Sequence, residues 1–139
     1  MKRITAIAIF VLAGFVTINS ASAQEHVVHA TVPFNFAVNG KVLPAGSYTI
    51  TQVNSGTIEI ESRTMHIAAL SRPFYDSREL GGGGKLVFNK YGDQYFLKEV
   101  ICPYSGMTQI LPASKPEKKA RATQEAKLHG NDQVLVAAK

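Results

Sequence analysis

Short runs of alternating apolar and polar side chains, separated by turn signals, constrain the fold of this chain more than any other feature of its sequence. In residues 32–38 every second residue is a large apolar one, and further on Ile58 and Ile60 alternate with Glu59 and Glu61. A period of two places the apolar side chains on one face of a strand. Strands that recur about every 8–12 residues, with turns between them, predict a sandwich or a small barrel.

The turn signals predict where the strands pair. Asn39-Gly40 follows the first run and is a strong signal for a hairpin turn. Gly92-Asp93 separates two further apolar runs, and a glycine in the first place of a two-residue loop suits a type II′ turn. In that register Phe88 lies opposite Leu97, which is a favourable cross-strand pair.

No helical stretch separates these runs, so an antiparallel arrangement is favoured over a parallel sheet with helical crossovers. Pro33 cannot donate to a ladder, and we therefore expect its strand to begin there or to lie at an edge. The apolar run 65–71 is typical of a strand that is covered on both faces. Residues 73–84 include four consecutive glycines and are typical of a loop.

The composition changes near residue 112, where helix formers replace the alternating pattern. Residues 114–117 fit the S-x-x-E capping box, and we expect a helix over 115–128 with Gly130 at its C-terminal cap. Residues 134–136 predict a last strand that returns to the sheet. We therefore predict an all-β domain, a small antiparallel barrel or sandwich of about seven to eight short strands, with one C-terminal helix.

The first 23 residues have the composition of a secretory signal peptide. Two basic residues are followed by an apolar run, 4–18, and by the small-residue triplet Ala21-Ser22-Ala23. This order predicts export to the periplasm or the medium, with cleavage after Ala23. The run is shorter than the about 20 apolar residues of a membrane span. We therefore expect no transmembrane segment after cleavage, and a retained N-terminal anchor is the alternative.

Export divides the 139-residue chain into three parts. Residues 1–23 are expected to be removed, residues 24–112 to form the β-domain, and residues 113–139 to supply a helix and a terminal strand that pack on it. The lone cysteine, Cys102, cannot form an internal disulfide. At the end of an apolar run it is interpreted as a small buried side chain.

Three segments of the chain carry motifs that occur together in a fixed order. Residues 32–50 match the pattern V-P-F-x-F-x-V-x-G-x-x-L-P-A-G-x-Y-x-[IV]. Residues 85–97 match K-L-V-F-x-x-Y-G-x-x-Y-F-L, and residues 111–115 match L-P-x-S-K. In these segments the chain resembles a family of small secreted bacterial β-proteins of unknown function. The resemblance covers most of the chain after the signal peptide and implies export and a β-fold, but it implies no active site.

Motifs for metals, cofactors and nucleophilic catalysis do not occur in the sequence. The run 81–85, Gly-Gly-Gly-Gly-Lys, lacks the earlier Gly and the following Ser or Thr of the Walker pattern, and it leads into an expected strand. His26 and His29 are three residues apart, which puts them on opposite faces of a strand. No H-x-x-x-H, H-E-x-x-H or C-x-x-C motif accompanies them. We expect no metal site, no cofactor and no catalytic residue.

Glu59 and Glu61 carry the alternative of an enzymatic function. They lie two residues apart on one face of a strand, and the two carboxylates of a glycoside hydrolase lie roughly 5–9.5 Å apart. Their alternation with isoleucines favours a solvated sheet face instead. We therefore expect a protein that is not an enzyme, and keep a small hydrolase that uses these carboxylates as the second alternative.

Aromatic residues gather near the first strand and the last hairpin. A tyrosine presents an apolar body with a polar tip, and such rings can line a pocket at the mouth of a barrel. The candidate ligand-binding residues are Phe34, Phe36, Tyr91, Tyr95, Phe96 and Tyr104. Ordinary packing within a sheet is the other interpretation. A carrier of a small apolar ligand, held among these rings, is the first alternative function.

Charge is unevenly distributed along the chain. Residues 24–112 hold seven basic and seven acidic residues, whereas residues 113–139 hold six basic and three acidic ones. So small an excess on an exported chain speaks against a nucleic-acid partner. A weak contact of the basic C-terminal helix with an anionic surface is consistent with the pattern. We expect an exported, non-catalytic β-domain that serves as a binding module or as a structural or interaction module.

Overall fold

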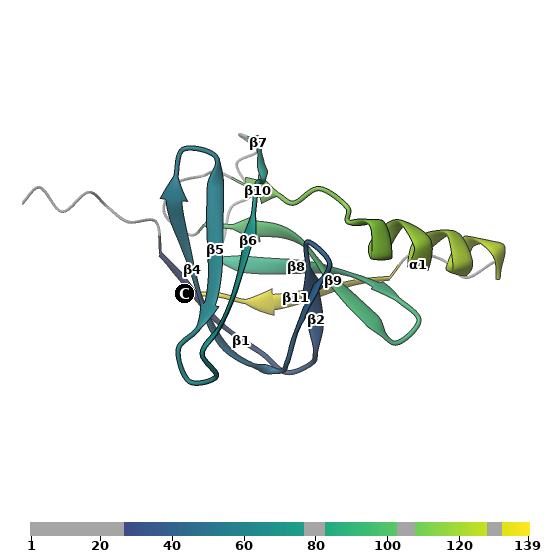
Figure 1. Ribbon diagram of the computed structural model, residues 1–139, viewed down its shortest axis with the longest axis horizontal. Helices are drawn as coiled ribbons and strands as arrows, with labels where there is room; N and C mark the ends of the chain where they lie inside the picture. The colour runs from purple at the N-terminus through teal and green to yellow at the C-terminus, as the bar shows by residue number, and fades with distance from the viewer. Residues whose placement is uncertain (1–26, 77–82, 103–107, 128–131) are drawn as a thin grey trace, which may run out of the picture.

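Eleven strands and one helix make up the part of the chain that the computed structural model describes, residues 27–76, 83–102, 108–127 and 132–139. The strands form two sheets that curl into a half-barrel, and the helix extends from one end (Figure 1). This confirms the predicted fold class. Four strands have only three residues each, and they account for the excess over the expected seven to eight. The predicted signal peptide, Tyr104 and Gly130 lie outside the described residues.

The first sheet has four strands in the order β1-β4-β5-β6, and every pair is antiparallel. Its strands are β1 (Val28–Val32), β4 (Gly46–Asn54), β5 (Thr57–Ser62) and β6 (Ile67–Ser71). On β5 the two isoleucines, Ile58 and Ile60, are buried, and the glutamates between them lie on the other face. The alternation in the sequence is therefore the alternation between core and outer surface.

The second sheet has seven strands, five of them in the order β11-β8-β9-β10-β7. These five are β11 (Asp132–Ala137), β8 (Lys85–Tyr91), β9 (Gln94–Ile101), β10 (Thr108–Ile110) and β7 (Phe74–Asp76). The hairpin of β2 (Phe36–Val38) and β3 (Lys41–Leu43) joins the same sheet through β2. There Ala37 pairs with Phe96 in parallel, and this is the one parallel pair among the described strands. The arrangement is thus antiparallel with a single parallel contact.

The two sheets meet at two places, at the end of the chain and between the β2–β3 hairpin and β6. The backbone N–H of His29 in β1 donates to the carbonyl of Lys139 at 2.7 Å, and Lys139 donates back at 2.8 Å. On the opposite side the β2–β3 hairpin approaches the edge strand β6 through side chains. Lys41 Nζ donates to the carbonyl of Ala68 at 2.6 Å, and Asn39 Nδ2 donates to that of Leu70 at 3.4 Å. These contacts join the sheets around a common interior.

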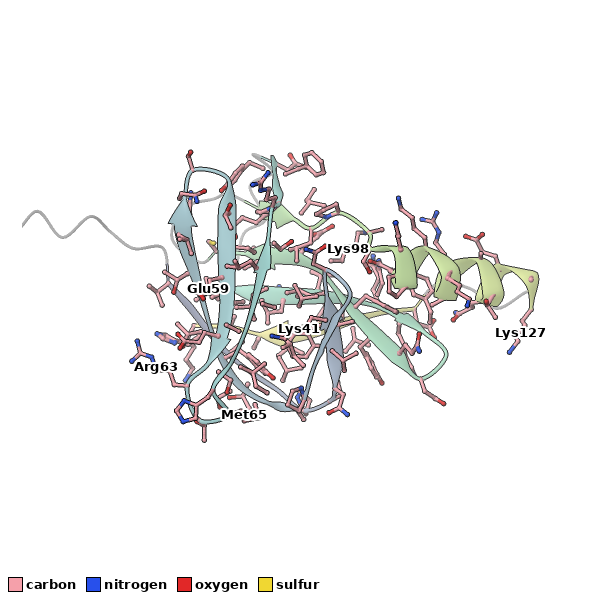
Figure 2. All side chains as sticks on the ribbon, viewed as in Figure 1. Lys41, Glu59, Arg63, Met65, Lys98 and Lys127 are labelled. Carbon is pink, nitrogen blue, oxygen red and sulfur yellow. The ribbon has the colours of Figure 1, made fainter. Side chains whose placement is uncertain are left out.

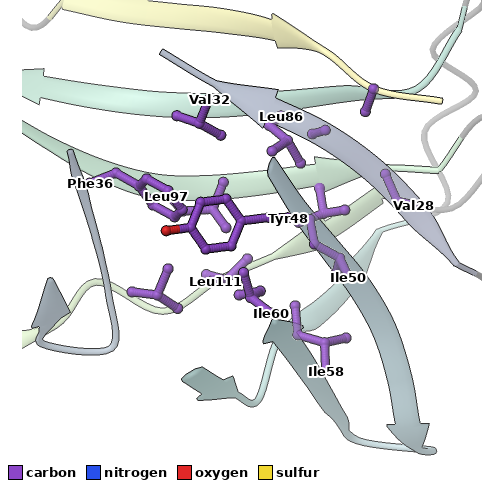
Figure 3. Packing of buried hydrophobic residues seen from close by; sticks show 14 of the residues in the cluster. Val28, Val32, Phe36, Tyr48, Ile50, Ile58, Ile60, Leu86, Leu97 and Leu111 are labelled. Atoms are coloured by element: carbon purple, nitrogen blue, oxygen red, sulfur yellow. The ribbon is translucent and has the colours of Figure 1, made fainter. Parts of the chain in front are cut away.

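One apolar core fills that interior, with side chains from both sheets (Figure 3). Its largest fully buried members include Phe36, Phe88, Leu43, Ile50, Ile58, Ile60 and Leu86. Cys102 is buried in the same cluster, as expected for a small apolar side chain. The core therefore lies between the four-stranded sheet and the β8–β9 hairpin.

Several local predictions are confirmed. Asn39 and Gly40 form the turn between β2 and β3, both with positive φ, 49° and 84°. In the β8–β9 hairpin Tyr91 pairs with Gln94, so Gly92-Asp93 is the two-residue turn, and Phe88 lies opposite Leu97. The C-terminal strand β11 pairs with β8 along its whole length.

Three local predictions are wrong. The run 32–38 is not one strand but the end of β1 and the start of β2, and Pro33, which has no N–H to donate, lies in the break. β6 is an edge strand with Leu70 56% exposed, not a strand covered on both faces, because the outer face of the first sheet is open. The segment 73–84 is not all loop, since β7 forms within it by pairing with β10.

The helix α1 (Lys115–Ala126) begins where the capping pattern places it. The Ser114 hydroxyl accepts a hydrogen bond from the backbone N–H of Glu117 at 3.4 Å. Proline follows at the start of the helix, where its missing N–H costs nothing. In Figure 1 the helix runs outward beside the tip of the β8–β9 hairpin. Side chains of the helix therefore contact residues of that hairpin.

Candidate functional site

Three of the six predicted aromatic residues, Phe34, Phe36 and Tyr95, belong to one cluster of rings inside the half-barrel. The rings of Phe34 and Tyr95 are parallel with centroids 4.0 Å apart, and Phe34 also meets Phe88 edge to face at 5.1 Å. Phe36 meets Phe88 at 5.3 Å and Tyr48 at 5.1 Å, both edge to face. Edge-to-face and offset contacts of this kind are the geometry in which aromatic cores pack. Phe88 and Tyr48 complete the chain of rings and were not among the predicted residues.

The remaining predicted rings lie on the other face of the hairpin. Tyr91 and Phe96 are both buried, with centroids 5.9 Å apart. Phe96 follows Tyr95 directly, so the two side chains point to opposite faces of β9. The structure therefore divides the six candidates into an inner group and a pair beneath the helix, and Tyr104 lies outside the described residues.

Tyr48 is the polar member of the ring cluster. Its hydroxyl donates to the carbonyl of Pro44 at 2.6 Å, and only 2% of the residue is exposed. Burial raises the pKa of the Tyr48 hydroxyl above its usual value, because the phenolate would lose its hydration there. The ring therefore stays neutral, and it packs as part of the core.

A polar seam joins helix α1 to the hairpin. Asn89 Nδ2 donates to Glu117 Oε1 at 3.0 Å, and each of these residues is only 6% exposed. About two turns further along the helix, the backbone N–H of Gly92 donates to Gln124 Oε1 at 2.7 Å. In a capping box the last side chain bonds back to the start of its own helix. The Glu117 carboxylate instead binds a side chain of β8, and no signal in the sequence indicated this contact.

An open groove runs along one flank of α1 and the tip of the hairpin. Its volume is about 1060 Å³, and β8, β9 and the helix all contribute to its walls. The charged side chains that line it are Lys90, Lys119, Lys127, Asp93 and Asp132. Lys119, Thr123 and Lys127 are four residues apart along α1, so they lie on the same flank of the helix. Figure 2 shows Lys127 at the outer end of the helix.

Glu59 and Glu61 lie on the outward face of β5, as the alternation predicts. Across the strand pair Glu59 faces Thr51 and Glu61 faces Thr49. His29 Nδ1 is 3.2 Å from the hydroxyl of Thr49 on the same face. Figure 2 shows Glu59 on the outside of the sheet. The two carboxylates thus belong to a polar sheet surface of hydroxyl, carboxylate and imidazole groups.

Two further observations concern only the described part of the chain. No three His, Cys, Asp or Glu side chains gather there as a set of metal ligands. No helix there is long and apolar enough to cross a membrane. His26 and His129 lie outside the described residues.

Comparison of the chain with protein-family models, with curated proteins and with solved structures gave no match.

Proposed function

We propose that this chain is an exported, non-catalytic β-domain that serves as a binding module, and that it binds an acidic polysaccharide in the groove between α1 and the β8–β9 hairpin. The observation that carries the proposal is the flank of the helix that lines the groove with Lys119 and Lys127. Lys90 of the hairpin also borders the groove, with its Nζ 5.7 Å from the centroid of the Tyr95 ring. The half-barrel acts as the scaffold that holds these two elements together.

The charge of the helix supports an acidic ligand. Residues 115–127 carry five cationic side chains and two carboxylates. One of the carboxylates, Glu117, is buried against Asn89 and does not face the solvent. The solvent-exposed surface of the helix therefore has a clear positive excess, which attracts anions at a distance of up to about 8 Å in physiological salt.

The uncharged part of the groove supports a sugar. Gln94 and Thr123 line it beside the lysines, and amide and hydroxyl groups can both donate to and accept from sugar hydroxyls. The two aspartates of the groove, Asp93 and Asp132, can likewise accept from hydroxyls. A polymer of uronic acids presents carboxylates and hydroxyls along one chain, which matches this mixture of groups.

The test is a titration of the full chain with polygalacturonate, followed by isothermal calorimetry and by NMR of the backbone amides. We expect saturable binding, with shifts confined to β8, β9 and α1, and a weakening when the salt concentration is raised. The double variant Lys119→Glu with Lys127→Glu should bind at least tenfold more weakly. Uncharged dextran should not bind.

A matched control separates the groove from net charge. Lys85 is exposed at the start of β8 and does not line the groove. Arg72 is likewise exposed and outside the groove. A variant with Lys85→Glu and Arg72→Glu changes the total charge by the same amount and should retain binding. An equal loss in both double variants, or dextran binding as strong as polygalacturonate binding, would contradict the proposal.

Export is tested separately, by the intact mass of the protein recovered from outside the cytoplasm of an expressing bacterium. Cleavage after Ala23 gives a chain that begins at Gln24. A mass that corresponds to the full 139 residues would show that the N-terminal segment is retained.

A further inference from the structure

A second, smaller hollow lies on the other flank of α1, away from the groove. Its volume is about 140 Å³, and it lies between the helix and the face of the hairpin beneath it. Its inner wall includes Asn89 and Glu117, and its rim includes Lys98, Lys118 and Arg121. Figure 2 shows Lys98 beside the start of the helix. The carboxylate thus lies on the inner wall, and the cationic side chains lie at the rim.

The inner wall contains a hydrogen-bond acceptor that lacks a donor. Asn89 uses its Nδ2 to bind Glu117, and this fixes the orientation of the amide. Its Oδ1 is buried and has no hydrogen-bond partner among the described residues. A buried acceptor that is left unpaired is unfavourable, and the neighbouring carboxylate is also an acceptor. An occupant that brings several N–H groups would satisfy both.

The rim is positively charged and would attract an anion. Lys98 lies 3.6 Å from Glu99, and Arg121 lies 3.6 Å from Glu125. Both distances exceed those of direct hydrogen bonds, so each cation keeps donors for a ligand. Lys118 is exposed and adds a third positive charge. A carboxylate placed between these side chains would be attracted by all three.

We infer that this hollow binds a small zwitterion of the α-amino-acid class, with its ammonium group against Asn89 Oδ1 and the Glu117 carboxylate and its own carboxylate at the cationic rim. A volume of about 140 Å³ corresponds to that of about five water molecules. It therefore admits glycine or alanine. For a ligand with as few non-hydrogen atoms as glycine, the lowest attainable Kd is on the order of a few μM. The site lies on the other flank of the helix from the polysaccharide groove, and Tyr91 borders both.

The test is an NMR titration of the labelled full chain with glycine at neutral pH, observing the side-chain amide of Asn89 and the backbone amides of α1. We expect saturable shifts in both. Acetate carries only the anionic half of the ligand and methylammonium only the cationic half, so each should bind at least tenfold more weakly. Glu117→Gln keeps an acceptor for Asn89 but removes the charge, and should weaken glycine binding about tenfold.

The control uses neighbouring lysines of the same helix. Lys118→Ala removes a rim cation and should weaken glycine binding several-fold, whereas Lys119→Ala, which faces the groove, should leave it unchanged. No saturable shift at Asn89 would overturn the inference and assign the hollow to interior water alone. Equal responses to glycine and acetate would also overturn it, since they would indicate an anion at the rim without an ammonium inside.

Discussion

The apolar core and the polar seam beneath α1 hold the molecule together in different ways. The core is formed by aliphatic and aromatic side chains from both sheets, and its aromatic rings touch edge to face. The seam depends on a few directional bonds, of which Asn89–Glu117 is buried and Gly92–Gln124 is exposed. Burial of apolar area stabilises the half-barrel whatever the detailed pairing. The helix, by contrast, depends on particular partners.

This difference predicts two levels of stability. A helix of 12 residues is marginal by itself, so α1 persists because it is docked. Loss of a seam contact should release the helix while the strands stay folded. Loss of a core ring should weaken the whole domain. Local and global opening can be distinguished by hydrogen exchange of individual amides.

The largest effect is expected for Phe88→Ala. Phe88 is fully buried and contacts the rings of Phe34 and Phe36. Its truncation leaves a cavity in the core and should lower the free energy of unfolding by about 3–5 kcal/mol, as measured by urea denaturation. The control Leu135→Ala removes an apolar side chain that is 63% exposed. A similar loss in both variants would show that the core is not where the stability lies.

A smaller and local effect is expected for Asn89→Ala. The change removes the donor that Glu117 needs and should weaken the docking of α1 by about 1.5–3 kcal/mol, because the bond involves a buried charged group. Amide exchange should speed up in α1 and remain slow in β4 and β5. Gln133 lies opposite Asn89 on β11 but is exposed, so Gln133→Ala is the control. Equal acceleration in the strands and the helix would contradict a separate seam.

The core also predicts a response to alkaline pH. Burial raises the pKa of Tyr48, so its neutral form contributes stability that is complete below the unfolded pKa of about 10 and is lost as pH rises through the higher folded pKa. Tyr48→Phe removes this pH dependence. It also removes the hydrogen bond to Pro44, which should lower the free energy of unfolding by about 0.5–1.5 kcal/mol at neutral pH. The free energies of unfolding of the two proteins should therefore differ at neutral pH and approach each other above pH 10. A difference that stays constant with pH would show that Tyr48 is not the titrating group.

A comparably small effect is expected at the helix cap. Ser114→Ala removes the acceptor for the Glu117 N–H and should destabilise α1 by about 1 kcal/mol. Circular dichroism should show more fraying of the helix, without a change in the strand signal. Ser55→Ala, in an exposed turn, serves as the control. An effect as large as that of Asn89→Ala would mean that the cap, rather than the seam, holds the helix in place.

The features that could be predicted from the sequence are those set by neighbours in the chain. The Asn39-Gly40 and Gly92-Asp93 turns, the opposition of Phe88 and Leu97 and the helix start at Ser114 follow from local geometry, and all are confirmed. The candidate sites depend on contacts between distant segments. The candidate aromatic residues were proposed as one group, whereas the structure divides them between the two faces of the hairpin. Strand alternation separates Tyr95 from Phe96, and only the placement of α1 decides that the second face is covered.

By itself the sequence determined an all-β architecture with one C-terminal helix, because a period of two and turn residues act over a few positions. Only the tertiary structure decided that Glu117 binds Asn89 across the seam, and that Pro33 divides the first run between two sheets. It also decided that β6 ends its sheet beside Lys41. These outcomes depend on which surfaces remain to be covered once the sheets have curled around the core, and a local pattern does not contain that information.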